Sequence, residues 1–157
     1  MGKSRLLAVL EEAGVSYELL PHERTERALA EAEALGVDPA EVAKTLVVST
    51  PTGYVRAVLP AAERIDLRKL SEVLGVPKKR LHLASEQTLE RDYAEFELGA
   101  VPPFGGSRPD PLVVDRHAAE RKSLVVEAGS HAESLRLKTA DLVRLTEAQV
   151  ADICAEG

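Results

Sequence analysis

The chain is poor in aromatic residues and in cysteine. Aromatic side chains make up 3% of its 157 residues, and tryptophan is absent. Proteins that read single-stranded nucleic acid stack successive bases on aromatic rings, so this scarcity excludes an RRM-like or multi-base OB-type reader. The single cysteine, Cys154, has no partner for an internal disulfide bond, and it excludes a cysteine-based zinc site within one chain.

Long apolar runs are also missing. Runs such as 46–48 and 112–114 are far shorter than the roughly 20 residues that cross a bilayer, and the N-terminus leads directly into an amphipathic pattern. We therefore expect a cytoplasmic protein with no membrane contact. The length and the 45% content of apolar residues are typical of one globular domain spanning residues 1–157.

Acidic residues outnumber basic residues in the chain as a whole, but one segment has an excess of basic residues. The formal net charge of −6 argues against a generic polyanion binder. Between residues 64 and 82, however, basic side chains outnumber the two acidic ones. This segment is either a solvated helix face with its following turn or a patch for a short phosphate segment. Its basic members are Arg64, Arg68, Lys69, Lys78, Lys79 and Arg80.

Proline and glycine separate a series of short elements, and no repeat or low-complexity tract interrupts them. Periodicity and capping predict helices at residues 3–13, 25–35, 67–74 and 85–91, helical turns after Asp38 and from Thr146, and a helix capped by Thr139. Strands are predicted at 15–20, 43–49, 54–59, 112–115, 123–127 and 134–138, with turns at 51–53 and 128–129 and a long loop at 97–111. Because some strands are joined by hairpins and others by helices, we expect an α/β fold in which helices flank a mixed, largely antiparallel central sheet.

Most catalytic templates are absent from the sequence. There is no G-x-S-x-G elbow, no Walker loop and no H-E-x-x-H motif. Asp115 and His117 have the spacing of one strand face but no third ligand, and the other histidines are scattered, so we expect no metal and no cofactor. Cys154 has no neighbouring base and is expected to pack in the apolar end of the final helix. Any catalysis would rely on backbone groups, a bound substrate group or a lone charge.

Two features suit chemistry with few ionisable side chains. Lys44 opens an apolar strand, where a lysine either snorkels at the sheet edge or enters a pocket. The segment Gly99-Ala100-Val101-Pro102-Pro103-Phe104-Gly105 combines glycine, which permits close backbone approach, with proline, which fixes φ. Such a segment is either a rigid surface turn or a set of outward N–H donors that stabilise a developing oxyanion.

These features occur in an order that resembles one family. The matching segments are Lys44-Thr45-Leu46-Val47-Val48, residues 58–61 with 64–70, the loop at 99–105, residues 112–115 and residues 125–129. Over residues 15–153 the sequence is similar to the YbaK and prolyl-tRNA-synthetase-associated editing domains. The resemblance implies a mixed α/β hydrolase that acts in trans to remove a small amino acid, notably cysteine or alanine, from mischarged tRNA-Pro.

The resemblance also implies roles for particular residues. Backbone amides of the Gly99–Pro103 loop, with Gly99 and Ala100 foremost, would hold the aminoacyl end, and Lys44 would fix the terminal adenosine or its phosphate. Hydroxyl groups of the terminal ribose, or a substrate thiol, would assist in place of a protein base. Further substrate-binding candidates are Tyr17, His22, Thr45, Val101, Pro102, Pro103, Gly129 and His131. The basic residues from Arg64 to Arg80 would bind tRNA, and a synthetase is a candidate partner.

One segment departs from the family pattern. Many relatives carry Gly-Lys-Arg-Gly or Gly-Arg-Arg-Gly where this chain has Gly129-Ser130-His131-Ala132. The change removes two positive charges, so His131 is either a replacement pocket contact or an exposed turn residue. The altered segment also favours an alternative function, in which a non-catalytic module of the same fold binds an aminoacyl end or another small acyl ligand. A structural interaction protein is a third interpretation, but it would leave the Gly99 loop unexplained.

Overall fold

The computed structural model describes residues 2–21 and 36–156, so the helix expected at 25–35 and the candidate His22 lie outside the described residues. Within those two ranges the chain forms α-helices and two β-sheets, which confirms the expected mixed α/β class. The strands divide between two sheets instead of forming one central sheet. None of the helices described is long and apolar enough to span a membrane.

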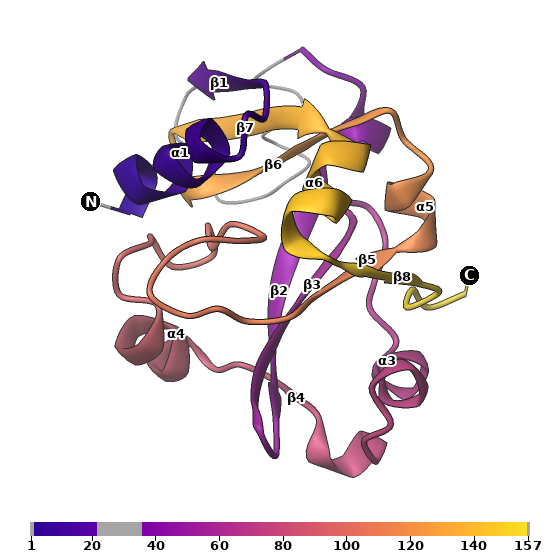
Figure 1. The fold of residues 1–157 in the computed structure, drawn as a ribbon. Coiled ribbons are helices and arrows are strands. Elements are labelled where there is room, and N and C mark those ends of the chain that lie inside the picture. Colours follow the sequence, from indigo (N-terminus) through magenta and orange to yellow (C-terminus); the bar gives the residue numbers. More distant parts are fainter. Residues whose placement is uncertain (1, 22–35, 157) are drawn as a thin grey trace.

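The smaller sheet is antiparallel and lies at the top of Figure 1. In spatial order its strands are β1 (Tyr17–Pro21), β7 (Glu133–Lys138) and β6 (Ser123–Ser130). Two helices lie on one side of it, α1 (Gly2–Glu12) and α6 (Thr139–Thr146). Leu6 and Leu10 of α1 and Leu142 of α6 are fully buried against this sheet, so an apolar core fixes both helices.

The larger sheet has five strands and runs down the centre of Figure 1. In spatial order they are β4 (His82–Leu83), β2 (Ala43–Thr50), β3 (Gly53–Pro60), β5 (Leu112–Asp115) and β8 (Gln149–Ala151). β4, β2 and β3 are antiparallel to one another, whereas β3, β5 and β8 are parallel. α3 (Leu67–Leu74) packs on one face, where Leu70 is fully buried with Val48 and Ala57.

The two sheets meet at the start of β2. Val42 forms a parallel bridge with Val125 of β6, whereas β2 pairs with β4 only from Val48 onward. Between these two points no strand among the described residues pairs with the outer edge of β2. The remaining described helices are α4 (Glu86–Asp92), α5 (Arg116–Ala119) and the 3₁₀ turns η1 (Pro39–Glu41) and η2 (Lys78–Arg80).

Three elements in the first two thirds of the chain agree with the sequence predictions. Asp66 accepts hydrogen bonds from the first amides of α3, Gly75 ends that helix in the left-handed region, and Ser85 caps α4. Asp38 also caps a helical turn as predicted, and the turn is η1.

Three predictions near the C-terminus were wrong. Thr139 is the first residue of α6 and not its cap, and its buried hydroxyl has no partner among the described residues. The segment from Thr146 does not start a helix, because Glu147 ends α6 with a positive φ and Val150 then pairs with Val114 in a parallel strand. β6 continues through residues 128–129, and the turn follows at 131–132.

Candidate active site

A cavity of about 310 Å³ opens beside the unpaired edge of β2. β2, β4, α4, the 97–101 loop and β6 all contribute to its wall. The lining residues are Lys44, Thr45, Leu46, Val47, Leu83, Ala84, Leu89, Gly99, Val101 and Glu127. The sequence analysis named Lys44, Thr45, Gly99 and Val101 among these, and the fold brings those four together.

The backbone of β2 is exposed to this cavity because its neighbouring strand starts late. The carbonyl of Val47 accepts a hydrogen bond from the amide of Ala84 at 2.9 Å, so Val47 directs its backbone groups toward β4. Backbone groups alternate sides along a strand, and those of Thr45 therefore point the same way, into the cavity. The Thr45 hydroxyl is buried and has no hydrogen-bond partner within the described ranges. Thr45 thus offers unpaired polar groups to a ligand.

Lys44 lines the cavity, and its ammonium group also interacts with Cys154 and Arg64. It is half-buried, and this loss of hydration lowers the pKa of its ammonium group. The electrostatic interaction with Cys154 raises the pKa of Lys44, whereas the charge of Arg64 lowers it further. A partly dehydrated ammonium group attracts an anion more strongly than a fully solvated one, because less water screens the charge.

The loop that follows α4 is held against β6 by backbone hydrogen bonds. The amide of Glu97 donates to the carbonyl of Gly129 at 2.9 Å, and the amide of Gly129 donates to the carbonyl of Ala100 at 3.0 Å. Gly99 lies between these bonds with a φ of 82°, a conformation that strongly favours glycine. The loop is therefore rigidly placed at the cavity wall.

Only part of this loop can donate hydrogen bonds to a ligand. The amide of Ala100 donates to the carbonyl of Glu97 at 3.0 Å, so it already has a partner within the loop, and a catalytic role for Ala100 stays a prediction. Pro102 and Pro103 have no N–H group, and both are buried. Within residues 2–21 and 36–156, no hydrogen bond uses the amides of Gly99 or Val101. These two amides are the donors that remain.

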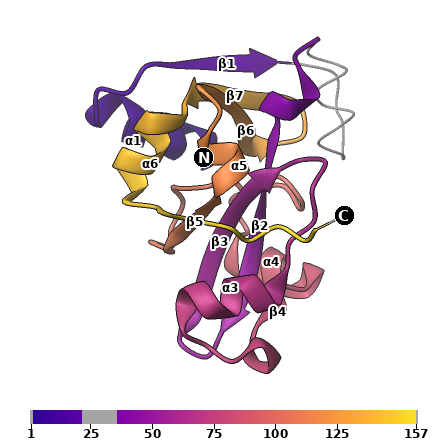
Figure 2. The ribbon, with the colours of Figure 1, turned by 90° about the vertical axis from the view of Figure 1, so that its right-hand side faces the viewer.

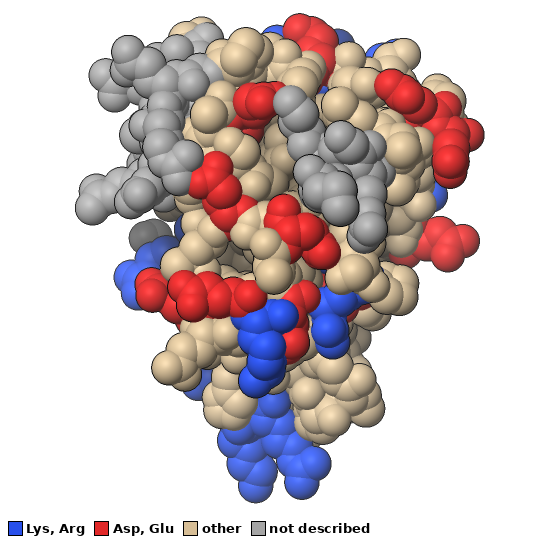
Figure 3. Space-filling view, turned by 90° about the vertical axis from the view of Figure 1, so that its left-hand side faces the viewer, with Lys and Arg blue, Asp and Glu red and all other residues tan. Residues whose placement is uncertain are grey.

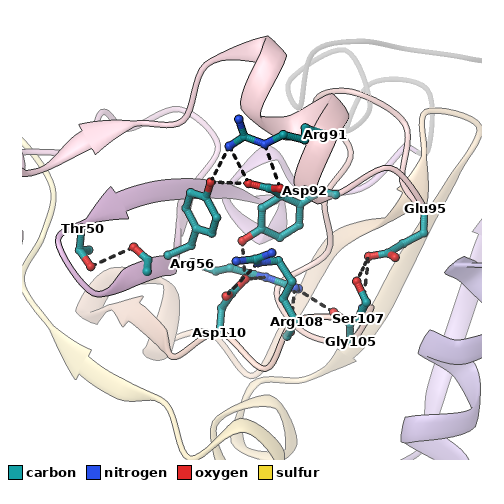
Figure 4. Close-up of polar contacts among 12 residues, drawn as sticks. Thr50, Arg56, Arg91, Asp92, Glu95, Gly105, Ser107, Arg108 and Asp110 are labelled. Atoms are coloured by element: carbon teal, nitrogen blue, oxygen red, sulfur yellow. Dashed lines mark hydrogen bonds and ion pairs between the residues drawn. The ribbon is translucent and has the colours of Figure 1, made fainter.

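Arg56 of β3 fixes the other half of the loop, and sequence reasoning missed it. Its side chain is 1% exposed. Its guanidinium donates to the carbonyls of Pro102 and Gly105, both at 2.9 Å, and to the Asp110 carboxylate at 3.1 Å. Figure 4 shows the side chain reaching across to Asp110 and Gly105. A rigid fork of five donors suits such convergent acceptors, which a lysine could not reach together.

Tyrosines extend this network toward α4. The hydroxyl of Tyr93 donates to Asp110, and that of Tyr54 donates to Asp92, both at 2.5 Å. Burial and the bond to Asp110 raise the pKa of Tyr93, so its hydroxyl stays protonated as a donor. The Arg108 guanidinium stacks on the Tyr54 ring at 4.8 Å (Figure 4).

Gly129 and His131 lie behind the loop and not in the cavity wall. An imidazole nitrogen of His131, Nε2, lies 2.5 Å from the carbonyl of Leu98, and its backbone amide donates to Glu97 at 3.2 Å. A Cβ placed on Gly99 would lie 3.4 Å from the His131 ring. His131 is 8% exposed, so the exposed-turn interpretation was wrong, and its contacts are with the loop.

Comparison with known proteins identifies the family. Residues 22–145 match the family described as the aminoacyl-tRNA editing domain. The chain belongs to that family. A solved structure described as a candidate trans-editing enzyme for prolyl-tRNA synthetase superposes with a TM-score of 0.83 at 26% identity, covering 99% of this chain and 98% of that one. The family resemblance seen in the sequence is thereby confirmed, and the chain is an aminoacyl-tRNA editing domain.

Two curated relatives of this editing domain are named after different amino acids. EbsC of Enterococcus faecalis, named as a candidate Cys-tRNA(Pro)/Cys-tRNA(Cys) deacylase, is 30% identical over 123 residues, which are 78% of this chain and 73% of that protein. ProXp-y of Escherichia coli, named as a multifunctional Ser/Thr-tRNA deacylase, is 29% identical over 153 residues, 94% of this chain and 90% of that protein. Both names refer to small side chains.

Tyr17 has a contact away from the cavity of the editing domain. The hydroxyl of Tyr17 donates a hydrogen bond to the Glu11 carboxylate at 3.0 Å, and Tyr17 pairs with Leu137 in the three-stranded sheet. Neither Tyr17 nor these two partners line the cavity. A substrate contact by Tyr17 therefore stays a prediction.

The predicted basic patch is divided. Lys78, Lys79 and Arg80 form η2 and are exposed, as are Arg64 and Arg68. Figure 3 shows Lys and Arg gathered at the lower tip of the molecule, where η2 follows α3 in Figure 1. Lys69 instead donates to Asp152 at 3.1 Å and to the carbonyl of Cys154 at 2.8 Å, so it anchors the C-terminal segment.

Glu127 lines the cavity and, like Arg56, was not identified from the sequence. It is 7% exposed and lies on β6, on the wall across from the β2 edge. An acidic residue at the end of an apolar strand gives no local sign of its position. Only the meeting of the two sheets brings this carboxylate near Lys44 and Thr45.

Proposed function

We propose that this editing domain hydrolyses tRNA-Pro mischarged with a small amino acid such as cysteine or alanine. The cavity volume of about 310 Å³ is at the lower end of the roughly 300–1,000 Å³ typical of ligand pockets. Its wall includes the apolar side chains of Leu46, Leu83, Leu89 and Val101, which suit a short and uncharged side chain.

The observation that carries the proposal is the pair of available amides at Gly99 and Val101. When water attacks the ester carbonyl, negative charge develops on the carbonyl oxygen, and preorganised N–H donors stabilise it. The network around Arg56 holds the loop before substrate arrives, so the amides need little reorganisation in the transition state. An aminoacyl ester is already activated, and positioning it supplies much of the remaining acceleration.

Charged groups at the two sides of the cavity complement the two ends of an aminoacyl-adenosine. Lys44 binds the terminal phosphate or a ribose oxygen, and Glu127 faces the α-ammonium group of the amino acid. The Thr45 hydroxyl binds a ribose hydroxyl or the ester oxygen. The attacking water passes its proton, assisted by a hydroxyl of the terminal ribose, to the departing ribose oxygen, so the products are the free amino acid and tRNA with an intact 3′ end.

A deacylation screen tests this proposal. Purified protein is incubated with alanyl-, cysteinyl-, seryl- and prolyl-tRNA-Pro, and the remaining aminoacyl-tRNA is measured over time. We expect fast hydrolysis of the alanyl or cysteinyl ester and slow hydrolysis of the prolyl ester. Equal rates for all four esters would contradict the selectivity, and the same screen on a tRNA with another anticodon tests the preference for tRNA-Pro.

A binding module without turnover is the second candidate, and the altered segment after Gly129 favours it. In that case acceptor-stem RNA would bind while none of the four esters is hydrolysed. We also propose a synthetase that charges the same tRNA as a partner. Co-purification with purified prolyl-tRNA synthetase, with and without tRNA, tests this association.

A further inference from the structure

Four side chains that can bind a metal ion converge on the opposite side of the larger sheet from the loop network. Glu63 follows β3, Asp115 ends β5, His117 lies in α5 and Cys154 lies near the C-terminus. Figure 2 shows the C-terminal segment passing between α3 and α5, which brings these four segments together. None of these residues takes part in the proposed deacylation.

Three of the donor atoms lie within 4.8 Å of one another, and the imidazole of His117 lies beside two of these three residues. His117 Nδ1 lies 3.4 Å from each carboxylate oxygen of Glu63 and 3.8 Å from Asp115 Oδ2. One oxygen of Glu63, one of Asp115 and the sulfur of Cys154 all lie within 4.8 Å of one another. Around zinc, bonds of roughly 2.0–2.3 Å at tetrahedral angles place donors about 3.3–3.8 Å apart. To close a four-coordinate shell, the His117 side chain has to rotate toward the other three donors.

Neighbouring groups already orient these donors. Asp115 is fully buried, and its two oxygens accept hydrogen bonds from the amides of Ile153 and His117, each at 2.9 Å. The carbonyl of Cys154 accepts a hydrogen bond from the ammonium group of Lys69, and the backbone of Cys154 forms an isolated antiparallel β-bridge with Ile65. Such outer contacts are typical of metal sites, where they fix the direction of each ligand.

An open path leads to three of the four residues. Glu63, His117 and Cys154 line a cavity of about 380 Å³ on the surface, so an ion reaches them without unfolding of the chain. Burial and the neighbouring Glu63 and Asp115 carboxylates raise the pKa of the Cys154 thiol. Without a metal ion the thiol is therefore protonated, and metal binding has to release this proton to solvent.

We propose that Glu63, Asp115, His117 and Cys154 bind one zinc ion that fastens the C-terminal segment to β5, α5 and the segment after β3. A thiolate, an imidazole and two carboxylates are ligands that zinc accepts, whereas calcium and magnesium prefer oxygen alone. Four protein ligands fill the tetrahedral shell, so the ion is structural and not catalytic. The sequence led us to expect no metal, because Glu63 and Cys154 are far from the Asp115 and His117 pair along the chain.

Titration with cobalt, a spectroscopic substitute for zinc, tests this proposal. Purified metal-free protein is titrated with Co²⁺, and absorption is recorded in the visible and near-ultraviolet regions. We expect one equivalent to bind with intense tetrahedral bands and a sulfur-to-metal charge-transfer band. Because Cys154 is the single cysteine in the chain, that band reports on this site alone. Zinc should displace the cobalt and abolish the bands.

Two variants and one control make the test decisive. Cys154→Ser should remove the charge-transfer band, and His117→Ala should weaken Co²⁺ binding at least tenfold. The control His82→Ala changes an exposed histidine outside the cluster and should bind Co²⁺ like the unaltered protein. A weak, octahedral spectrum without the charge-transfer band, or the same spectrum in Cys154→Ser, would overturn the proposal.

A second measurement does not depend on the variants. One equivalent of zinc should slow the reaction of Cys154 with a thiol reagent at least tenfold and raise the melting temperature. Unchanged thiol reactivity at saturating zinc would also overturn the proposal. Neither readout involves aminoacyl-tRNA, so failure here is distinct from failure of the proposed deacylation.

Discussion

At the scale of single residues, the site depends on Lys44, which contacts the substrate in the proposed mechanism, and on Arg56, which does not. Arg56 is buried beneath the loop and donates to three of its carbonyls and to Asp110. Such a buried cation is tolerated because four acceptors surround it, the Asp110 carboxylate and three loop carbonyls. Its role is to position the loop that carries the amides of Gly99 and Val101.

Replacing Lys44 tests the role of its charge at the cavity. Lys44→Ala should slow deacylation of the preferred ester at least tenfold, about 1.4 kcal/mol of transition-state stabilisation, because the phosphate or ribose loses its cation. Lys122→Ala, a matched change at an exposed lysine that does not line the cavity, should leave the rate within about twofold. An unchanged rate in folded Lys44→Ala protein would remove Lys44 from the mechanism.

Replacing Arg56 separates positioning from substrate contact. Arg56→Lys keeps the charge but cannot bond Pro102, Gly105 and Asp110 together, so kcat should fall about tenfold while KM changes less than twofold. The free energy of unfolding should fall by about 1–3 kcal/mol, as for other broken buried networks. Arg108→Lys changes the stacking on Tyr54 and Tyr93 and a long ion pair with Asp110 but leaves the bonds from Arg56 to the loop carbonyls in place, so it serves as the control. Loss of stability with unaltered kcat would argue against a positioning role.

At the scale of elements, the β2–β3 hairpin and α4 are joined by a polar contact at the surface. The Asp92 carboxylate at the end of α4 binds both Arg91 and Tyr54, and these contacts lower the pKa of Asp92 to about 2. A carboxylate that is ionised more easily in the folded state stabilises that state above its unfolded pKa of roughly 4. α4 in turn supplies Leu89 to the cavity wall, so the contact bears on the shape of the site.

This contact predicts a defined pH dependence. The stability that Asp92 contributes should be complete above about pH 4 and should disappear as pH falls toward about 2, where the folded carboxylate becomes protonated. Urea unfolding from pH 2 to pH 6 measures it. The difference between the unaltered protein and Asp92→Asn should be largest at pH 5 to 6 and shrink toward zero at pH 2. A difference that does not depend on pH would contradict the assignment.

At the scale of the whole molecule, charge and cavity are arranged for one short stretch of nucleic acid. The chain carries a net charge of −6, yet the exposed side chains of Lys78, Lys79 and Arg80 stand together at one tip. This arrangement suits contact with a few phosphates and not with a long duplex. Acidic residues elsewhere on the surface would repel other parts of the tRNA and restrict its approach.

The salt dependence of tRNA binding measures this contact. Each phosphate contact contributes roughly 0.7–0.9 to the slope of log affinity against log salt, so replacing Lys78, Lys79 and Arg80 by alanine should reduce that slope by about 2. Fluorescence anisotropy with labelled tRNA at several salt concentrations gives the slope. A double change at Lys122 and Lys138, both exposed and away from η2, is the control. Equal slopes in the two variants would show that the tip does not contact phosphate.

The sequence predicted those elements that carry their own boundary signals, and it failed where distant segments meet. Asp66 and Gly75 delimit α3 locally, and the glycine-proline loop was recognisable from its composition. The pairing of β8 with β5 was not, because parallel pairing comes from tertiary contact and leaves no mark in a three-residue strand. Arg56 and Glu127 look like outward-facing strand residues until the loop and the second sheet cover them.

The strand order also bears on how the protein emerges from the ribosome. The first strand, β1, pairs with β7, and β5 pairs with β8, whose last residue is Ala151. Neither sheet can be completed until nearly the whole chain has been made, and non-local pairing of this kind slows folding. During synthesis the nascent protein would carry unpaired strand edges, which are prone to aggregate and are the surfaces that chaperones cover. Its dependence on such assistance should therefore exceed that of a helical protein of equal length.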